Sequence, residues 1–254
     1  MKPPVVVKVG GAALADGGWL DSFAATASRA GEPLLIVHGG GPEISAVSER
    51  LGVPVEWHEG RRVTTPAVLE AAAMVLNGVI NKRIVATLQR AGVDAVGVSG
   101  VDGALLRAEP AAAGALGLVG RVTHVRTELL HRFRSLGLSV VVSPISLAAD
   151  GGQLNVNADE AAAAIAAAVH APELLFLTDV PGVRSETGTL PSLSTSDAEA
   201  LLARGVATGG MAVKLRAALA ALASGVASVR IGNLETLESA SAGTVLLRSL
   251  EAVA

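Results

Sequence analysis

The chain of 254 residues contains no cysteine, which excludes disulfide frameworks, zinc-thiolate sites and thiol nucleophiles. Its five histidines are scattered along the chain, so we expect no metal site built from protein side chains. Aromatic residues make up only 2% of the chain, and the net charge is −3 with no dense Lys/Arg run. Nucleic-acid partners require cationic surfaces and rings on which bases stack, so we expect none.

Long uninterrupted hydrophobic runs are also absent, although half of the residues are apolar. Glycine, proline or a charged residue interrupts every apolar stretch before the ~18 residues that a membrane-spanning helix requires. Only Met-Lys-Pro-Pro stands before the first apolar run at residues 5–9, so no secretory signal is visible. We therefore expect a cytoplasmic protein with no membrane partner and with a small-molecule ligand.

Short Val/Leu/Ile runs alternate with helical patterns along the whole chain. This alternation is typical of βαβ units and of a mostly parallel sheet with helices on both faces. We predict an α/β fold, a three-layer αβα sandwich with a mostly parallel central sheet. The predicted strands are residues 5–9, 34–37, 95–98, 138–142, 174–177, 226–231 and 244–247. The predicted helices lie around residues 20–27, after Gly41, and at 66–91, 158–169, 198–203 and 211–223.

Two irregular segments, residues 55–64 and 104–122, interrupt the alternation and are predicted to be hairpins. Such additions at the rim of a sheet form a lid, a subunit contact or plain surface connections. No disordered linker separates the two halves of the chain. We therefore expect one continuous domain with an N-terminal lobe (1–150) and a C-terminal lobe (151–254) on one sheet, divided near residues 145–155.

Two glycine turns follow the first two predicted strands. Gly10 and Gly11 come directly after the first strand, close to Lys8, and residues 39–41 are three glycines after the second strand. Glycines at such positions let backbone N–H groups approach an anion at a helix N-terminus. Ordinary strand-to-helix turns are the alternative. Neither a P-loop nor Gly-x-Gly-x-x-Gly is present, so a Rossmann dehydrogenase is not expected.

Polar residues also gather at the start of the Ala-rich helix in the second half. Asn157 is the predicted N-cap of this helix, and Asp159 follows in its first turn. If the segment before it is extended, Asn155 and Asn157 face one side and both amides can bind one ligand. A cap and turn without a ligand is the alternative.

Two further segments of the second half indicate a nucleotide or phosphate. Thr178 and Asp179 end a predicted strand, which is where nucleotides bind in open α/β sheets. Lys214 is placed in the first turn of the helix that follows residues 209–211. A lysine there opposes the helix dipole, so an anionic partner is expected, with a solvated lysine as the alternative.

Arg62 is a predicted carboxylate ligand, because the guanidinium group matches a carboxylate with two parallel hydrogen bonds. We interpret the other notable side chains as structural or solvated, with no direct role at a site: Arg61, His38, Trp19, Trp57, Lys82 and Arg83.

In order along the chain, these segments resemble the amino acid kinase family, and within it the enzymes that act on N-acetyl-L-glutamate. The segments are residues 8–11, 38–42, 60–64, 81–82, 155–159, 178–183 and 209–214. The resemblance spans nearly the whole chain. It implies ATP-dependent phosphorylation of the γ-carboxylate of N-acetyl-L-glutamate in arginine biosynthesis, with ATP as co-substrate and Mg²⁺ carried on ATP.

The resemblance also implies a role for individual residues. Lys8 and Lys214 would stabilise the transferring phosphoryl group, and Asp159 would orient both lysines. The acyl-amino-acid site, in the N-terminal lobe, would comprise Gly40, Gly41, Arg62, Asn155 and Asn157. The ATP site, mainly in the C-terminal lobe, would comprise Gly10, Gly11, Thr178, Asp179, Val180, Gly182, Val183, Val206, Thr208, Gly209, Gly210 and Met211.

The chain departs from the family pattern at two places. Val101 stands where the acetylglutamate enzymes usually carry lysine, and residues 231–233 are Ile-Gly-Asn where Asp-Gly-Arg is common. The first departure resembles the enzymes of lysine biosynthesis that phosphorylate N-acetyl-aminoadipate, so this longer substrate is an alternative. A non-catalytic amino-acid-sensing module is another, although Lys8, Asp159 and Lys214 together argue against it.

The resemblance bears on assembly as well. Arginine-inhibited members of the family carry an extra N-terminal helix through which dimers join into hexamers. Because the first predicted strand begins at about Val5, we expect an arginine-insensitive homodimer, paired through the lobe that contains residues 66–91. Binding of a nitrogen-signalling regulator stays open.

Overall fold

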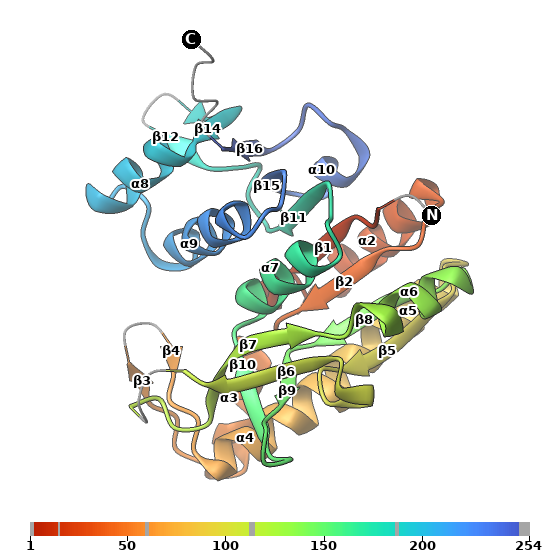
Figure 1. Cartoon of the computed structure of the whole chain (residues 1–254), viewed down its shortest axis with the longest axis vertical. Coiled ribbons are helices and arrows are strands. Elements are labelled where there is room, and N and C mark those ends of the chain that lie inside the picture. The colour runs from red at the N-terminus through yellow and green to blue at the C-terminus, as the bar shows by residue number, and fades with distance from the viewer. Residues whose placement is uncertain (1–2, 15, 59–60, 112–114, 186–187, 249–254) are drawn as a thin grey trace.

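The computed structural model describes residues 3–248, except residues 15, 59–60, 112–114 and 186–187. The strands of its central sheet are β1 (Val6–Val9), β2 (Leu35–His38), β5 (Ala95–Ser99), β8 (Ser139–Ser143), β11 (Glu173–Leu177), β14 (Ser192–Ser194), β15 (Ser228–Gly232) and β16 (Thr244–Leu247). In space their order is β14-β16-β15-β11-β1-β2-β8-β5 (Figure 1). Every neighbouring pair is parallel except β15 with β16, so the prediction of a mostly parallel sheet is confirmed.

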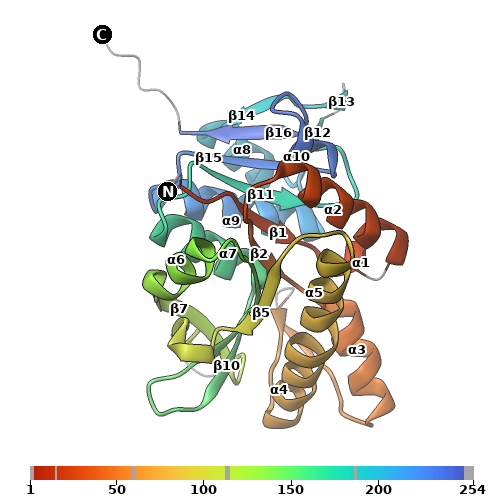
Figure 2. The same cartoon turned by 90° about the vertical axis from the view of Figure 1, so that its right-hand side faces the viewer.

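Helices cover both faces of this sheet (Figure 2). They are α1 (Gly11–Leu14), α2 (Gly17–Ala30), α3 (Gly41–Arg50), α4 (Pro66–Ala73), α5 (Asn81–Arg90), α6 (Thr127–Ser135), α7 (Ala158–Ala168), α8 (Thr195–Ala203), α9 (Gly209–Ala223) and α10 (Glu235–Glu238). Neighbouring strand residues enter different cores, because side chains alternate along a strand. Val6 and Leu35 belong to the cluster of α7 and α9, whereas Val7 and Ile36 belong to that of α2 and α5. The predicted three-layer αβα sandwich is confirmed.

Side-chain caps fix several helix starts that the site depends on. The side chain of Asn157 accepts hydrogen bonds from the backbone N–H groups of Asp159 and Glu160, as predicted for the N-cap of α7. Thr65 caps α4 in the same way, and Pro66 follows at a position where a missing N–H costs nothing.

A small second sheet lies beside the central one. Its strands are β6 (Leu106–Pro110), β7 (Val119–Val125), β9 (Ile145–Leu147) and β10 (Gln153–Val156). The pairing of β6 with β7 confirms the predicted hairpin at 104–122. The other predicted hairpin is also confirmed, as β3 (Trp57–His58) with β4 (Arg61–Arg62). A third, short hairpin joins β12 (Arg184–Ser185) to β13 (Gly188–Thr189).

Several elements differ from the predictions. The long helix 66–91 is not α-helical throughout, because the π-helical segment η1 (Met74–Ile80) separates α4 from α5. The helix α6 and the strands β9 and β10 are not predicted at all. Only two residues of α6 are buried, Leu130 and Arg134. The last two strands fall at residues 145–156, where the sequence suggests only a division between lobes.

Within the described residues, the helical stretch Pro66–Arg90 has the length and apolar composition of a membrane-spanning helix. Half of its most apolar window is buried inside the protein, so the same composition also fits a core helix. Leu76, Ile80 and Ile84 belong to one of the two cores.

Candidate functional site

The two glycine turns lie in backbone contact at the carboxyl ends of β1 and β2. These strands are parallel neighbours, with Val9 opposite His38. A Cβ atom built on Gly11 would lie 3.0 Å from the Gly40 nitrogen and 3.1 Å from the Gly41 nitrogen. A Cβ on Gly40 would collide with Leu76 and Ile80. Only glycine therefore permits this approach, and it brings the N-termini of α1 and α3 together.

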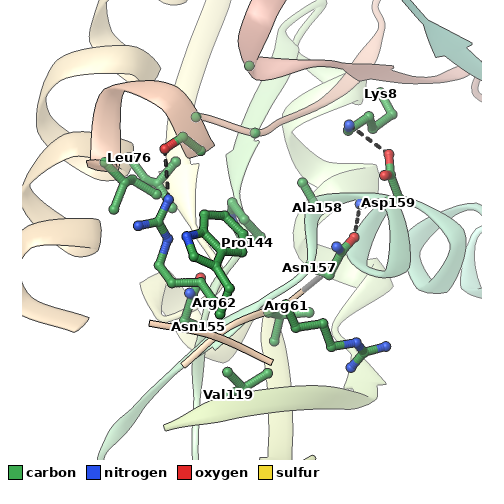
Figure 3. Close-up of a pocket in the computed structure, with 17 residues that line it drawn as sticks. Lys8, Arg61, Arg62, Leu76, Val119, Pro144, Asn155, Asn157, Ala158 and Asp159 are labelled. Atoms are coloured by element: carbon green, nitrogen blue, oxygen red, sulfur yellow. Dashed lines mark hydrogen bonds and ion pairs between the residues drawn. The ribbon is translucent and has the colours of Figure 1, made fainter. Parts of the chain in front are cut away.

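A buried ion pair stands opposite these turns. Lys8 and Asp159 are 5% and 6% exposed, and their side chains meet at 2.6 Å between Nζ and Oδ1 (Figure 3). Two charges this buried require each other, since an unpaired one would carry a large desolvation cost. Lys8 comes from β1 and Asp159 from the first turn of α7, so the pair joins the two halves of the chain.

Lys214 approaches the same pair from α9. Burial, together with the positive charge of Lys8, lowers the pKa of Lys214 below its ordinary value, while Asp159 and Asp179 act in the opposite direction. The structure thus brings Lys8, Asp159 and Lys214 together. The helix α9, which carries Lys214, begins at Gly209 rather than at Met211. Lys214 therefore lies in the second turn, and the prediction that it lies in the first turn is wrong. Gly209, the first residue of α9, has a φ of +52°, in the left-handed region that favours glycine.

Arg62 is buried at the opposite wall, in the hairpin β3–β4. Its Nη2 donates to the carbonyl oxygen of Gly41 at 2.9 Å and to the Ser45 hydroxyl at 2.8 Å. Its Nη1 is buried and has no hydrogen-bond partner among the described residues. Burial also lowers the pKa of the guanidinium group below its ordinary value, because the charge loses solvation. A buried cation with a free donor is suited to bind an anion.

Lys8, Asp159, Arg62 and the glycines at 39–41 line one cavity of about 230 Å³, here called the acceptor cavity (Figure 3). Asn155 contributes from β10, and its amide donates to the Thr64 hydroxyl at 3.2 Å. Asn157 lies on the same wall. The described lining residues are Lys8, Gly11, Gly39, Gly40, Gly41, Ile44, Trp57, Arg61, Arg62, Leu76, Val119, Pro144, Asn155, Val156, Asn157, Ala158 and Asp159. All five residues assigned to an acyl-amino-acid site by resemblance are among them.

Of the residues assigned to a nucleotide, Gly11 lines this same cavity, and the others of the described C-terminal half follow β11 or lie before and at the start of α9. Thr178 follows β11, and its hydroxyl donates to Asp179 at 2.8 Å. Val183 is buried in the core, and its N–H donates to the Thr244 hydroxyl at 2.8 Å. Gly182 leaves no room for a Cβ against Thr244 and Thr189. The following residues of this group are exposed or half-buried: Val180, Val206, Thr208, Gly209, Gly210 and Met211.

Two side chains interpreted as structural or solvated, His38 and Arg83, contact the segments around the glycine turns. His38 is fully buried between the Gly39 carbonyl oxygen and the Asn81 amide, as expected of a structural residue. Burial, with smaller effects of Lys8 and Lys82, lowers its pKa to about 4. Arg83 is more than part of a charged face, since it pairs with Glu43 of α3 at 2.9 Å and donates to the Leu14 carbonyl oxygen.

Two tryptophans were both predicted to fill packing space, and they differ. Trp19 stacks on Phe23 with ring centroids 5.6 Å apart, which confirms its packing role. Trp57 packs against Arg62 of the same hairpin, with the guanidinium 4.6 Å from its ring centroid, which agrees with the predicted hairpin packing. It is also 58% exposed and lines the cavity, which the prediction does not include. Trp57 is the cross-strand partner of Arg62. Pairing the two strands of the predicted hairpin would have revealed this contact.

No role for Ser45, Thr64 or Asn81 is predicted from the sequence, although Thr64 and Asn81 belong to the segments that carry the resemblance. Ser45 accepts from Arg62, Thr64 orients Asn155, and Asn81 ties His38 to the Val98 and Val141 carbonyl oxygens. Gly60, within one of the motif segments, lies outside the described residues. Within the described part of the chain, no group of three or more His, Asp or Glu side chains is arranged to hold a metal ion.

Comparison with known proteins gives consistent relatives. The sequence profile of the Amino acid kinase family matches residues 3–233. The chain is 48% identical over 235 residues to an acetylglutamate kinase of Chloroflexus aurantiacus, covering 91% of this chain and 92% of that protein. An acetylglutamate kinase of Geobacillus kaustophilus is 44% identical, with 91% and 90% covered. Among solved structures, smu.665 of Streptococcus mutans superposes with a TM-score of 0.86 at 30% identity, covering 97% of this chain and 99% of that one.

Proposed function

This chain belongs to the amino acid kinase family, and we propose that it transfers the γ-phosphoryl group of ATP to the γ-carboxylate of N-acetyl-L-glutamate. The product is N-acetylglutamyl 5-phosphate, and the reaction is the second step of arginine biosynthesis. The relatives that share 43–48% of its residues over most of the chain carry the name acetylglutamate kinase, which supports this activity.

One observation carries the acceptor assignment. Arg62 is a buried guanidinium with an unpaired Nη1, and it lines a small cavity together with the glycine turn Gly40-Gly41. Such a donor suits the α-carboxylate of the acceptor. The amides of Asn155 and Asn157, on the same wall, suit the acetylamino group and the remaining oxygens.

The transfer needs no general base, since a carboxylate acceptor is already ionised at neutral pH. Positioning and charge neutralisation do most of the work. Lys8 and Lys214 neutralise the phosphoryl group between donor and acceptor, and Asp159 orients both ammonium groups. The close approach of Gly11 to Gly40 supports a transfer between ligands held at these two turns.

ATP lies over residues 178–183 and the N-terminus of α9, with its phosphates toward Gly10, Gly11 and Lys214, and it carries Mg²⁺. Asp179 is exposed there and close enough to Lys214 to act on its pKa. The N-terminal lobe (1–150) thus supplies most of the acceptor site, to which Asn155 and Asn157 also contribute, and the C-terminal lobe (151–254) supplies most of the ATP site. Located in the cytoplasm, the enzyme works as a homodimer that pairs through the helical stretch Pro66–Arg90.

Val101, which suggests N-acetyl-aminoadipate as an alternative acceptor, packs against the apolar cluster of α2 and α5. It is not among the described residues that line the cavity. The departure at Val101 therefore gives no direct reason for a longer acceptor.

A coupled hydroxamate assay with ATP tests the assignment against four acceptors: N-acetyl-L-glutamate, N-acetyl-aminoadipate, carbamate and aspartate. We expect turnover to be fastest with N-acetyl-L-glutamate. Lys214→Ala should lower kcat by at least ~10²-fold, as for removal of one preorganised electrostatic group. Turnover with only one of the other acceptors would overturn the assignment of N-acetyl-L-glutamate as substrate. Near-normal turnover of Lys214→Ala would overturn the proposed role of Lys214 in stabilising the phosphoryl group.

A further inference from the structure

Two adjacent arginines on β4 point to opposite sides, because neighbouring residues of a strand face away from each other. Figure 3 shows the side chains of Arg61 and Arg62 extending in different directions, Arg62 toward the glycine turn Gly40-Gly41. Arg61 forms an ion pair with Glu160 of α7. Glu160 directly follows Asp159 and donates its backbone N–H to the Asn157 side chain. The short strand β4 therefore carries one side chain that lines the acceptor cavity and one that pairs with α7, the helix of Asp159.

The hairpin that carries these arginines has little structure of its own. Each of its strands is two residues long, and such a hairpin does not stay folded in water without packing against the rest of a protein. At its end next to α4, Thr64 holds it through backbone hydrogen bonds with Leu116 and Leu118. Two side chains of β4 also hold the hairpin. Arg62 donates hydrogen bonds to α3, and Arg61 forms an ion pair with α7.

The Arg61–Glu160 pair also stands between two cavities. Arg61 and Asn157 line both the acceptor cavity and a second cavity between β7, α7 and α9, and Glu160 lines the second one. Among the described residues, the other charges acting on Glu160 are Asp159 and Arg121. Arg121 is already paired with Glu109 across β6 and β7. Arg61 is thus the main partner of Glu160, whose side chain is 32% exposed.

We propose that Arg61 and Glu160 are a pair of positioning residues that hold the β3–β4 hairpin against α7 and thereby set the affinity for the acceptor. The pair acts through Arg62 and Trp57, which the hairpin places at the cavity. This inference rests on the proposed function, since it names a determinant of the same acceptor site.

The test is a double-mutant cycle of Arg61→Ala, Glu160→Gln and the double variant, with KM measured separately for N-acetyl-L-glutamate and for ATP. Exposed ion pairs contribute modestly, so we expect each single change to raise the acceptor KM about three- to fivefold. The KM for ATP and kcat should stay within about twofold, and the double variant should match the single ones, because all three lack the same contact.

Arg90→Ala is the matched control, because Arg90 pairs with Asp21 on the surface away from the cavity. It should leave both KM values unchanged. Calorimetric binding of N-acetyl-L-glutamate without nucleotide gives a second readout, in which the same weakening is expected. Additive effects of the two changes, an acceptor KM unaffected by Glu160→Gln, or equal changes in both KM values would overturn the proposal. A wild-type enzyme inactive on N-acetyl-L-glutamate would instead refute the proposed function.

Discussion

His38 shows at the scale of one residue how burial at the end of β2 changes a side chain's chemistry. Its ring is fully buried, accepts a hydrogen bond from Asn81 and donates one to Gly39, so the neutral form fits its surroundings. The pKa of about 4 follows from this burial first and from Lys8 and Lys82 next. In the unfolded chain the same residue has its ordinary pKa of 6.5.

This difference predicts a loss of stability in acid. Between pH 6.5 and 4 the unfolded chain binds a proton at His38 and the folded protein does not, so the stability present above pH 6.5 is lost as the pH falls. From pH 7 to 5 the free energy of unfolding should fall by about 2 kcal/mol through this residue. Denaturant titrations at both pH values should show a smaller fall in His38→Gln, whereas His58→Gln, at an exposed position, should behave like the wild type. Equal falls in all three proteins would contradict the prediction.

How far single residues can be predicted depends on whether their partner is local in the chain. The N-cap Asn157 is predictable, because its partners are two and three residues away. Trp57 and Arg62 lie in one hairpin, and their contact follows once its strands are paired. The pairing of Arg61 with Glu160 spans 99 positions, and no local pattern reveals it.

Among the elements, the short helix α1 depends on the glycine at its start. A Cβ on Gly11 would press on the backbone of Gly40 and Gly41, which cannot give way as a flexible side chain would. We expect Gly11→Ala to separate the two turns and to lower kcat by at least ~10-fold, because displacement of reacting groups by a fraction of an ångström is costly. Steady-state kinetics with both substrates measure the effect.

Gly17→Ala is the control, because Gly17 begins α2 and a Cβ there has nothing within 4 Å. It should keep the wild-type kcat and even stabilise the helix by a few tenths of a kcal/mol to about 1 kcal/mol. Similar kinetics of the two variants would show that the contact between the turns is unimportant.

Most elements of the central sheet follow from apolar runs bounded by turns, and the strand at Thr244–Leu247 agrees with its prediction in both ends. The π-helical segment η1 does not follow, because π-helical and α-helical segments bury similar residues and differ by one residue per turn. Its position is nevertheless important, since Leu76 and Ile80 pack beneath Gly40. Tertiary packing at the acceptor turn, and not local preference, accounts for this irregularity.

At the scale of the whole molecule, the proposed homodimer would pair through exposed apolar side chains of η1. Met74 and Val79 are 49% and 48% exposed on η1, in the helical stretch that is apolar enough to resemble a membrane span. A self-associating face explains such side chains on a protein surface. Met74→Asp should therefore produce a monomer, because a dimer would bury an unpaired charge.

Light scattering after size exclusion measures the mass in solution, and the 25.3 kDa chain separates clearly from its dimer. Leu136→Asp is the control, since Leu136 is 74% exposed on the turn before β8, and it should remain a dimer. A wild-type monomer, or a dimer of Met74→Asp, would contradict the proposed surface.

The contact between the glycine turns has a consequence for how this enzyme can change. In the proposed function, donor and acceptor are held at the ends of β1 and β2, whose spacing of about 4.8 Å is imposed by backbone hydrogen bonds. Substitutions in the β3–β4 hairpin or around Asn155 can alter which acceptor fits, but they leave the distance across which the phosphoryl group moves untouched. Specificity can therefore drift while the geometry of transfer is inherited from the sheet itself.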